Sequence, residues 1–202
     1  MTTSKRPAAW REALGGWSKA GAVAHDWFGL TAEMQLDLYE RQGRSARARI
    51  VPGWRALERS LILRVQNVRI EAWHLRARAA LAAAAESPDE RPRLLREAGR
   101  DARRIRKEKM AWSDPLADLI LAGVAALRGD AEGAARRCAA AAHGFDGADM
   151  ALYAAATRRR HGRLVGGDEG RTLVAAADAW MTGQKIKNPA RWTAMLAPGF
   201  PD

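Results

Sequence analysis

The chain has 202 residues, of which 48 % are hydrophobic and 28 % charged, proportions typical of a soluble folded protein. Its formal net charge is +11, carried mostly by arginine, which suits phosphate or carboxylate recognition but also fits a generally arginine- and alanine-rich composition. No stretch approaches the roughly 18 apolar residues of a membrane span, and residues 1–7 lack a signal peptide's apolar region. We therefore expect a cytoplasmic protein without membrane contact.

Alternating Val/Ile/Thr runs are almost absent, and helical periodicity recurs throughout, so the predicted class is all-α. Residues 1–29 are expected to cap one end of the fold, with a short helix over 8–14 and aromatic residues up to Phe28. Thr31 is a candidate N-cap for the next helix. Pro52 should kink or split the helix after that, because proline has no amide hydrogen to donate.

The longest helical pattern runs over residues 61–86, with an apolar stripe expected to face the packed neighbours: Leu61, Val65, Val68, Ala72 and Leu75. Ser87-Pro88-Asp89 should end that helix, and a second helix over 91–110 follows. The second helix carries a dense Arg/Lys outer face. Together the two helices form a long hairpin.

A shorter hairpin is predicted over residues 113–142. Asp114 is a candidate cap for its first helix, and Gly129-Asp130 provides the turn. Short side chains line its second helix and permit close helix packing: Ala131, Ala134, Cys138 and Ala141. The lone Cys138 cannot form an internal disulfide, and we expect it to be a small buried apolar residue rather than a nucleophile.

The last hairpin is predicted from Met150 onward, with a break at 144–147, a turn at Gly166-Gly167 and a cap at Asp168. Residues 185–202 should form a C-terminal cap, in which Asn188-Pro189 starts a short helix. The sequence thus predicts a single domain over 1–202, an irregular array of antiparallel helical hairpins over 30–184 between two capping segments.

The central hairpin resembles the tetratricopeptide repeat. The residues that occupy that family's positions in register are Leu121, Ala122, Ala125, Gly129, Asp130, Ala134, Cys138 and Ala141. The resemblance implies an α-solenoid, although Asp118, Ala125 and Cys138 replace aromatic residues. The array would be irregular, because the hairpin over 61–110 is too long for a standard repeat.

Three segments carry a second resemblance: 63–66 (LRVQ), 75–81 (LRARAAL), and 188–191 (NPAR) together with 195–200 (MLAPGF). They look like the C-terminal helical-repeat region of large bacterial serine/threonine protein kinases, including those of myxobacteria. The resemblance implies a sensor or partner-binding module. The chain itself has no glycine-rich nucleotide loop, no His-Arg-Asp loop and no Asp-Phe-Gly motif.

We expect neither catalysis nor a cofactor. The four histidines, His25, His74, His143 and His161, are scattered and lack metal-ligand spacing, so no metal site is predicted. No nucleophile with a neighbouring base can be recognised.

Two polar stripes are the candidate partner-binding residues. The first consists of Arg64, Asn67, Glu71, His74 and Arg78, and the second of Asp149, Tyr153, Thr157 and Arg160. First helices of successive hairpins line the concave face of a repeat array, so we expect these stripes to bind an acidic or carboxylate-bearing segment of another protein. His74 would then strengthen binding below about pH 6.5. The alternative is a solvated face without a partner.

Nucleic-acid binding is the rival function. On a helix over 91–109, five cations share a broad face that could follow phosphates: Arg96, Arg100, Arg103, Arg104 and Lys107. Glu97, Asp101 and Glu108 are interleaved at spacings that allow pairs within the helix, which favours a solvated outer face over a nucleic-acid site.

Overall fold

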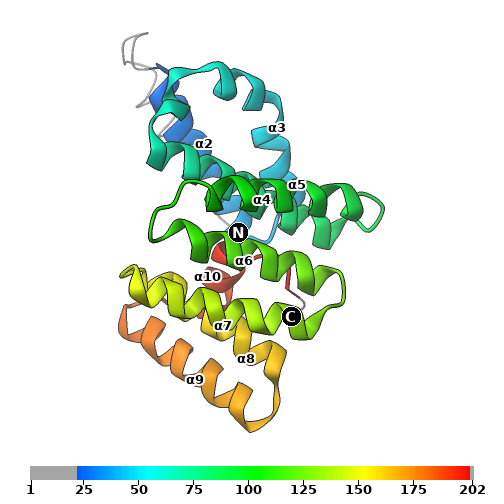
Figure 1. Cartoon of the computed structure of the whole chain (residues 1–202), viewed down its shortest axis with the longest axis vertical. Helices are drawn as coiled ribbons and strands as arrows, with labels where there is room; N and C mark the ends of the chain where they lie inside the picture. Colours follow the sequence, from blue (N-terminus) through cyan, green and yellow to red (C-terminus); the bar gives the residue numbers. More distant parts are fainter. Residues whose placement is uncertain (1–21, 201–202) are drawn as a thin grey trace, which may run out of the picture.

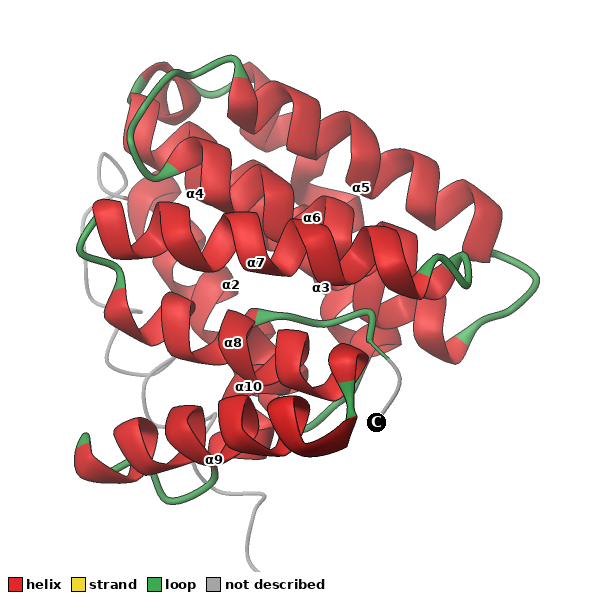
Figure 2. Ribbon diagram, turned by 60° about the horizontal axis from the view of Figure 1, so that its bottom comes forward, coloured by secondary structure: helices red, strands yellow, loops and turns green. Residues whose placement is uncertain are grey.

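The computed structural model describes residues 22–200, and every regular element in that part of the chain is a helix (Figure 2). The predicted all-α class is confirmed, while the helix expected over 8–14 lies outside the described residues. The first elements are α2 (Ala22–Tyr39), α3 (Gly43–Arg59), the 3-10 helix η1 (Leu61–Arg64), α4 (Gln66–Glu86) and α5 (Arg91–Arg106). They are followed by α6 (Ser113–Leu127), α7 (Ala131–Gly147), α8 (Ala151–Val165), α9 (Gly167–Gly183) and α10 (Pro189–Leu196).

Two predicted helix starts are found where expected. The side chain of Asp130 caps α7 by accepting a hydrogen bond from the Gly133 amide at 2.8 Å, after a turn in which Gly129 has a φ of +83°. The side chain of Asn188 caps α10 in the same way, accepting from the Arg191 amide at 3.0 Å. Local hydrogen bonding therefore decides these boundaries.

Other predicted boundaries are wrong. Thr31 lies inside α2, Asp114 inside α6 and Asp168 inside α9, and α7 continues to Gly147. In each case the helix extends past the local cap signal. Helix α3 is also not split at Pro52 but continues through it, and the missing donor of Pro52 would have paired with the carbonyl of Ala48. Both residues are exposed, so water can satisfy that carbonyl.

The helix predicted over 61–86 is divided. Val65 adopts an extended conformation between η1 and α4, with φ −74° and ψ 115°. Leu61 is 68 % exposed and Val65 54 % exposed, so the first part of the expected apolar stripe does not pack on neighbours. The later part does, because Ala72 and Leu75 are buried.

Each helix from α2 to α9 packs on the next along the chain, so the hairpins stack along the long axis of the molecule. In Figure 1 the stack runs from α2 and α3 at the top to α9 at the bottom. Helix α10 departs from this order, since it packs on both α8 and α2. The C-terminal segment, predicted to cap an end of the array, instead crosses its middle and links the two halves.

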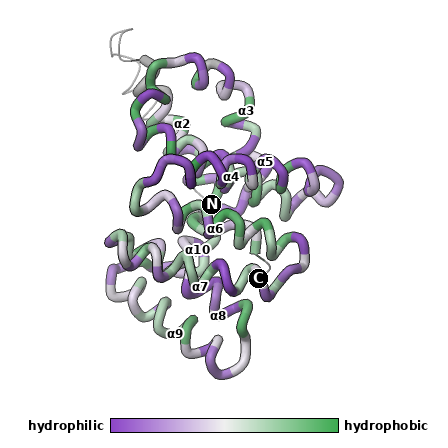
Figure 3. The backbone as a smooth tube through the Cα atoms, viewed as in Figure 1, coloured by the Kyte–Doolittle hydropathy of each residue, from purple (hydrophilic) through white to green (hydrophobic). Residues whose placement is uncertain are grey.

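Helix α4 contributes to two hydrophobic cores. Leu81 belongs to a core shared with α5, α6 and α7, which also contains Ile105, Ile120 and Phe145. Leu75 belongs to a second core, in which α2 and α3 meet α8, α9 and α10. In Figure 3 the hydrophobic colour is concentrated on α6 in the middle of the stack, whereas α5 is mostly hydrophilic.

Small residues permit close helix packing, as predicted for α7, where Ala134, Cys138 and Ala141 are fully buried, although Ala131, expected on the same face, is exposed. A close backbone approach is also found between α8 and α9. A Cβ added to Gly162 would lie 2.6 Å from the carbonyl oxygen of Gly170 and 2.9 Å from the Cβ of Leu173. These two helices therefore meet backbone to backbone.

We expect Gly162→Ala to lower the free energy of unfolding by about 1–3 kcal/mol, because the added methyl group must push α9 away. Gly53→Ala is the matched control, since a Cβ at that helical position would meet no atom within 4 Å. It should raise stability by up to about 1 kcal/mol. Urea unfolding followed by circular dichroism measures both. Equal stability of Gly162→Ala and the wild type would contradict the described α8–α9 contact.

Candidate functional site

The first predicted stripe does not form one solvent-facing surface. Arg64 lies in η1, and Asn67 and Glu71 are exposed at the start of α4. His74 is only 4 % exposed and Arg78 only 2 %. The expectation that this stripe lines an open concave face is therefore wrong for its second half, which points into the protein.

The second stripe is divided in the same way. Asp149 is exposed just before α8, but Tyr153 is partly buried, and Thr157 and Arg160 are buried. The ring of Tyr153 lies 5.8 Å from that of His74 on α4. The structure thus brings the two stripes together, as a repeat array would, but in its interior.

The C-terminal segment covers Arg78 and Arg160, and its residues 193–200 are all buried. Arg78 donates from Nη1 to the carbonyl oxygen of Met195 at 3.0 Å, and Arg160 donates from Nε to that of Ala197 at 2.9 Å. The Arg160 guanidinium also lies 5.1 Å from the centre of the Phe200 ring. Both carbonyls lie at the C-terminal end of α10, where helix carbonyls lack partners within the helix and carry partial negative charge.

Burial changes the role expected for His74. Desolvation, reinforced by the nearby positive charge of Arg78, lowers the pKa of His74 well below its ordinary value of 6.5. The imidazole therefore stays neutral at mildly acidic pH. The expected strengthening of partner binding through His74 below about pH 6.5 is wrong, because the side chain is neither accessible nor charged in that range.

The cations proposed for nucleic acid lie on the outer face of α5 or just after it. All five are exposed: Arg96, Arg100, Arg103, Arg104 and Lys107. Their exposure agrees with the predicted outer helix face, and nucleic-acid binding itself stays a prediction. Arg104 is the one of the five with a described ion pair, 3.4 Å from the carboxylate of Asp101.

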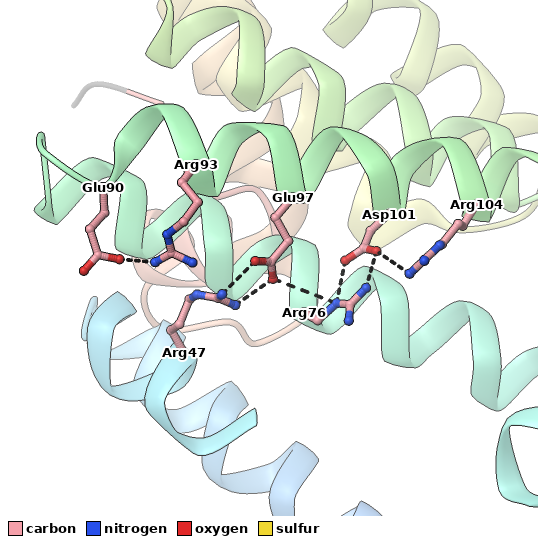
Figure 4. A network of polar contacts seen from close by, with 7 residues as sticks. All are labelled: Arg47, Arg76, Glu90, Arg93, Glu97, Asp101 and Arg104. Atoms are coloured by element: carbon pink, nitrogen blue, oxygen red, sulfur yellow. Dashed lines mark hydrogen bonds and ion pairs between the residues drawn. The ribbon is translucent and has the colours of Figure 1, made fainter. Parts of the chain in front are cut away.

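The interleaved carboxylates mostly pair between elements rather than within α5, contrary to expectation (Figure 4). Glu97 accepts two hydrogen bonds from the guanidinium of Arg47 on α3, both at 2.7 Å. Asp101 accepts two from Arg76 on α4, at 2.7 and 2.5 Å. Paired two-point contacts of this kind hold α3, α4 and α5 in a defined arrangement.

Asp101 is fully buried, and this has an electrostatic cost. Desolvation raises the pKa of Asp101, although its hydrogen bonds from Arg76 act in the opposite direction. The Arg76 guanidinium in turn lies 3.5 Å from the centre of the Trp54 ring, in a cation–π contact. The ion pair is thus packed between an aromatic ring and the protein interior.

Between α3 and α5 lie two adjoining hollows, which we call together the arginine groove. One has a volume of about 340 Å³ and the other of about 350 Å³, and Arg47 and Val51 belong to the walls of both. Seven arginines line the groove: Arg44, Arg47, Arg55, Arg76, Arg93, Arg100 and Arg104. Three glutamates accompany them: Glu58, Glu90 and Glu97.

The contribution of α3 to this surface was not predicted from the sequence. A signal was present, because Arg44, Arg47, Val51 and Arg55 are spaced for one face of a helix. The arginines of α5 were found, but from sequence alone nothing placed α3 beside them. Only the packing of both helices on α4 creates the groove.

The described residues contain no group of three or more His, Cys, Asp or Glu side chains placed to hold a metal ion. Cys138 is buried as expected, and burial raises the pKa of its thiol to about 12, which disfavours the reactive thiolate. None of the described helices is long and apolar enough to cross a membrane. Comparisons with protein-family models, with curated proteins and with solved structures gave no match for this chain.

We expect the free energy of unfolding to decrease as pH falls below about 6.5, because the unfolded chain binds a proton at His74 that the folded protein does not. The pKa of His74 is lower in the folded protein than in the unfolded chain. His74 therefore does not reduce the free energy of unfolding at a pH above its unfolded pKa. From this residue the loss is up to about 1.4 kcal/mol at pH 5.5. In urea unfolding, the free energy of unfolding should differ less between pH 7.5 and pH 5.5 for His74→Gln than for the wild type. The exposed His143 supplies the control, and His143→Gln should leave the difference unchanged.

We also expect Asp101→Asn to destabilise the protein by about 3 kcal/mol, since it leaves the mostly buried Arg76 without its main carboxylate partner. The double variant Arg76→Met/Asp101→Leu should recover much of that loss, because it removes both charges from the interior. Asp168→Asn disrupts an exposed pair with Arg171 and should leave the urea midpoint unchanged. If Asp101→Asn were as stable as the wild type, the pair of Arg76 and Asp101 would not be holding the helices together.

Proposed function

We propose that this chain is a non-catalytic scaffold that binds an acidic segment of another protein, as a cytoplasmic module of a bacterial signalling system. The resemblance of residues 113–142 to the tetratricopeptide repeat supports a helical-repeat scaffold. The resemblance of the 63–81 and 188–200 regions to the C-terminal part of serine/threonine kinases supports a place in signalling. Stacked helical hairpins offer extended surfaces of the kind that repeat proteins use for binding.

The observation that carries the proposal is the charge of the arginine groove. Seven arginines face three glutamates in its two hollows. Arginine guanidinium groups bind carboxylates through paired hydrogen bonds, and a cleft with an excess of one sign of charge speeds the association of oppositely charged partners. An acidic segment therefore matches the groove better than a neutral or basic one.

Apolar residues between the arginines give the groove a second kind of contact. Val51 is 50 % exposed where the two hollows meet, and Ala48, Pro52 and Leu94 line the second hollow. A partner segment with apolar residues between its acidic ones would cover this surface. Aliphatic burial supplies affinity, while the surrounding charges supply specificity and orientation.

The inner stripes are less suited to this role than the arginine groove. Arg78 and Arg160 already donate to the chain's own carbonyls, and residues 193–200 cover them. Binding a partner there would require the C-terminal segment to leave and eight buried residues to become exposed. The groove needs no such rearrangement.

Nucleic-acid binding is the second candidate, and one observation favours it. The five cations on and beside the outer face of α5 are exposed, and within the described residues only Arg104 has a carboxylate partner. Such a face can follow a phosphate backbone, and binding would then weaken steeply with added salt. A gel-shift titration across salt concentrations, with Arg96→Ser/Arg103→Ser as the test variant, separates this candidate from the first.

We expect a fluorescent 12-residue peptide of alternating Glu and Val to bind the protein, and its Gln–Val analogue to bind at least ten-fold more weakly. Arg55→Ser/Arg93→Ser should weaken binding of the acidic peptide about ten-fold or more, because each change removes a cation from one hollow. Fluorescence anisotropy measures both effects.

The control variant is Arg128→Ser/Arg163→Ser, which removes the same charge from exposed positions outside the groove. It should bind the acidic peptide nearly as well as the wild type does. Equal weakening by the two double variants would mean that net charge, rather than the groove, attracts the peptide. That result would contradict the proposed docking surface.

A further inference from the structure

We propose that the hollow beside Trp54, at one end of the arginine groove, is a binding site for a phosphate monoester, supplied by a phosphorylated side chain of the partner segment. This inference rests on the proposed function, because the phosphorylated residue belongs to the segment that docks in the groove. It adds a ligand class and a form of regulation, since a kinase or phosphatase acting on the partner would then control docking.

The charge of the hollow matches a phosphate dianion. Its wall contains five guanidinium groups, from Arg47, Arg55, Arg76, Arg100 and Arg104. Three carboxylates oppose them: Glu58 and Glu97 in the wall, and Asp101 behind it, paired with Arg76 and Arg104. The net charge is +2, which a phosphate monoester of about −2 neutralises and a single carboxylate does not.

The arginines divide into two that support the site and three that can bind. Arg47 and Arg76 are held by two-point contacts to Glu97 and Asp101 (Figure 4). Among the described residues Arg55 and Arg100 have no carboxylate partner, and the half-exposed Arg104 has one, Asp101, at 3.4 Å. Three guanidinium groups on two helices are therefore available to a ligand. Together they match the several oxygens of one phosphate better than the two oxygens of a carboxylate.

The framework of the hollow is built before any ligand arrives. Arg76 is fixed on one side by Asp101 and on the other by the ring of Trp54, 3.5 Å away. The Trp54 indole N–H is buried and has no hydrogen-bond partner among the described residues. Preformed donors reduce the entropy that binding must overcome.

The size of the hollow is also suitable. Its volume of about 340 Å³ is at the lower end of the range of ligand pockets, about 300–1,000 Å³. It opens into the rest of the groove past Arg47 and Val51, which belong to both hollows. A phosphorylated side chain can therefore enter one hollow while the segment on either side of it lies along the other.

The test compares three versions of one peptide that differ at a single central residue, namely phosphoserine, glutamate and serine, in a sequence of alternating Glu and Val. We expect the phosphoserine peptide to bind the full chain at least ten-fold more tightly than the glutamate peptide. The preference should shrink as pH falls below about 6, where the phosphate gains a proton and loses one charge. Fluorescence anisotropy at constant ionic strength measures both.

Two variants test whether the preference for the phosphoserine peptide over the glutamate peptide comes from this hollow. Arg100→Ser should reduce it to less than three-fold, because it removes a fork from the proposed phosphate site. Arg93→Ser, in the other hollow, should weaken all three peptides while keeping the preference. Inorganic phosphate, titrated against the isotopically labelled chain, should shift the Trp54 indole signal, identified by its loss in Trp54→Phe.

The outcomes distinguish the two proposals. If the glutamate and phosphoserine peptides bind equally and Arg93→Ser weakens both, the phosphate site is refuted while the acidic-segment scaffold stands. If none of the peptides binds, both proposals fail. If a single-stranded oligonucleotide displaces the phosphoserine peptide and its own binding is lost in Arg96→Ser/Arg103→Ser, phosphodiester recognition by α5 replaces this inference.

Discussion

The buried guanidinium groups of Arg78 on α4 and Arg160 on α8 bind carbonyls at the C-terminal end of α10 and so fix the position of that helix within the fold. A buried charge is costly unless nearby oxygens stabilise it, and the end of a helix supplies carbonyls with partial negative charge. Because one arginine lies on α4 and the other on α8, holding α10 links distant parts of the stack. An array of hairpins that could have remained open is thereby closed through its middle.

This closure moves the candidate site from the inside of the array to the outside. In the interior and in the groove alike, arginine guanidinium groups donate hydrogen bonds to oxygen atoms. Inside, it binds carbonyls of the chain and contributes to folding. Between α3 and α5 it binds the carboxylates of Glu97 and Asp101, and leaves other arginines facing outward. The groove is therefore a surface on which part of the charge is structural and part is available.

The acidic residues of α5 separate these two roles. Burial of Asp101 orients Arg76 and ties α5 to α4, whereas Arg96, Arg100 and Arg103 on the same helix are exposed. The helix thus has a face of inward carboxylates and a face of outward cations. Without the inward carboxylates, Arg47 and Arg76 would repel each other and the walls of the groove would not be fixed.

The sequence by itself determined the all-α class, the turns at Gly129-Asp130 and Gly166-Gly167, the caps at Asp130 and Asn188, and the burial of Cys138. These features depend on contacts within a few residues and on helical periodicity, both of which can be read along the chain. Helical spacing likewise placed His74 with Arg78 and Thr157 with Arg160 on shared faces. It could not show what covers those faces, because a buried arginine and a solvated one have the same spacing. The tertiary structure alone decided that the C-terminal segment occupies the interior and that arginines from α3 and α5 meet across α4, because both depend on contacts between residues far apart in the chain.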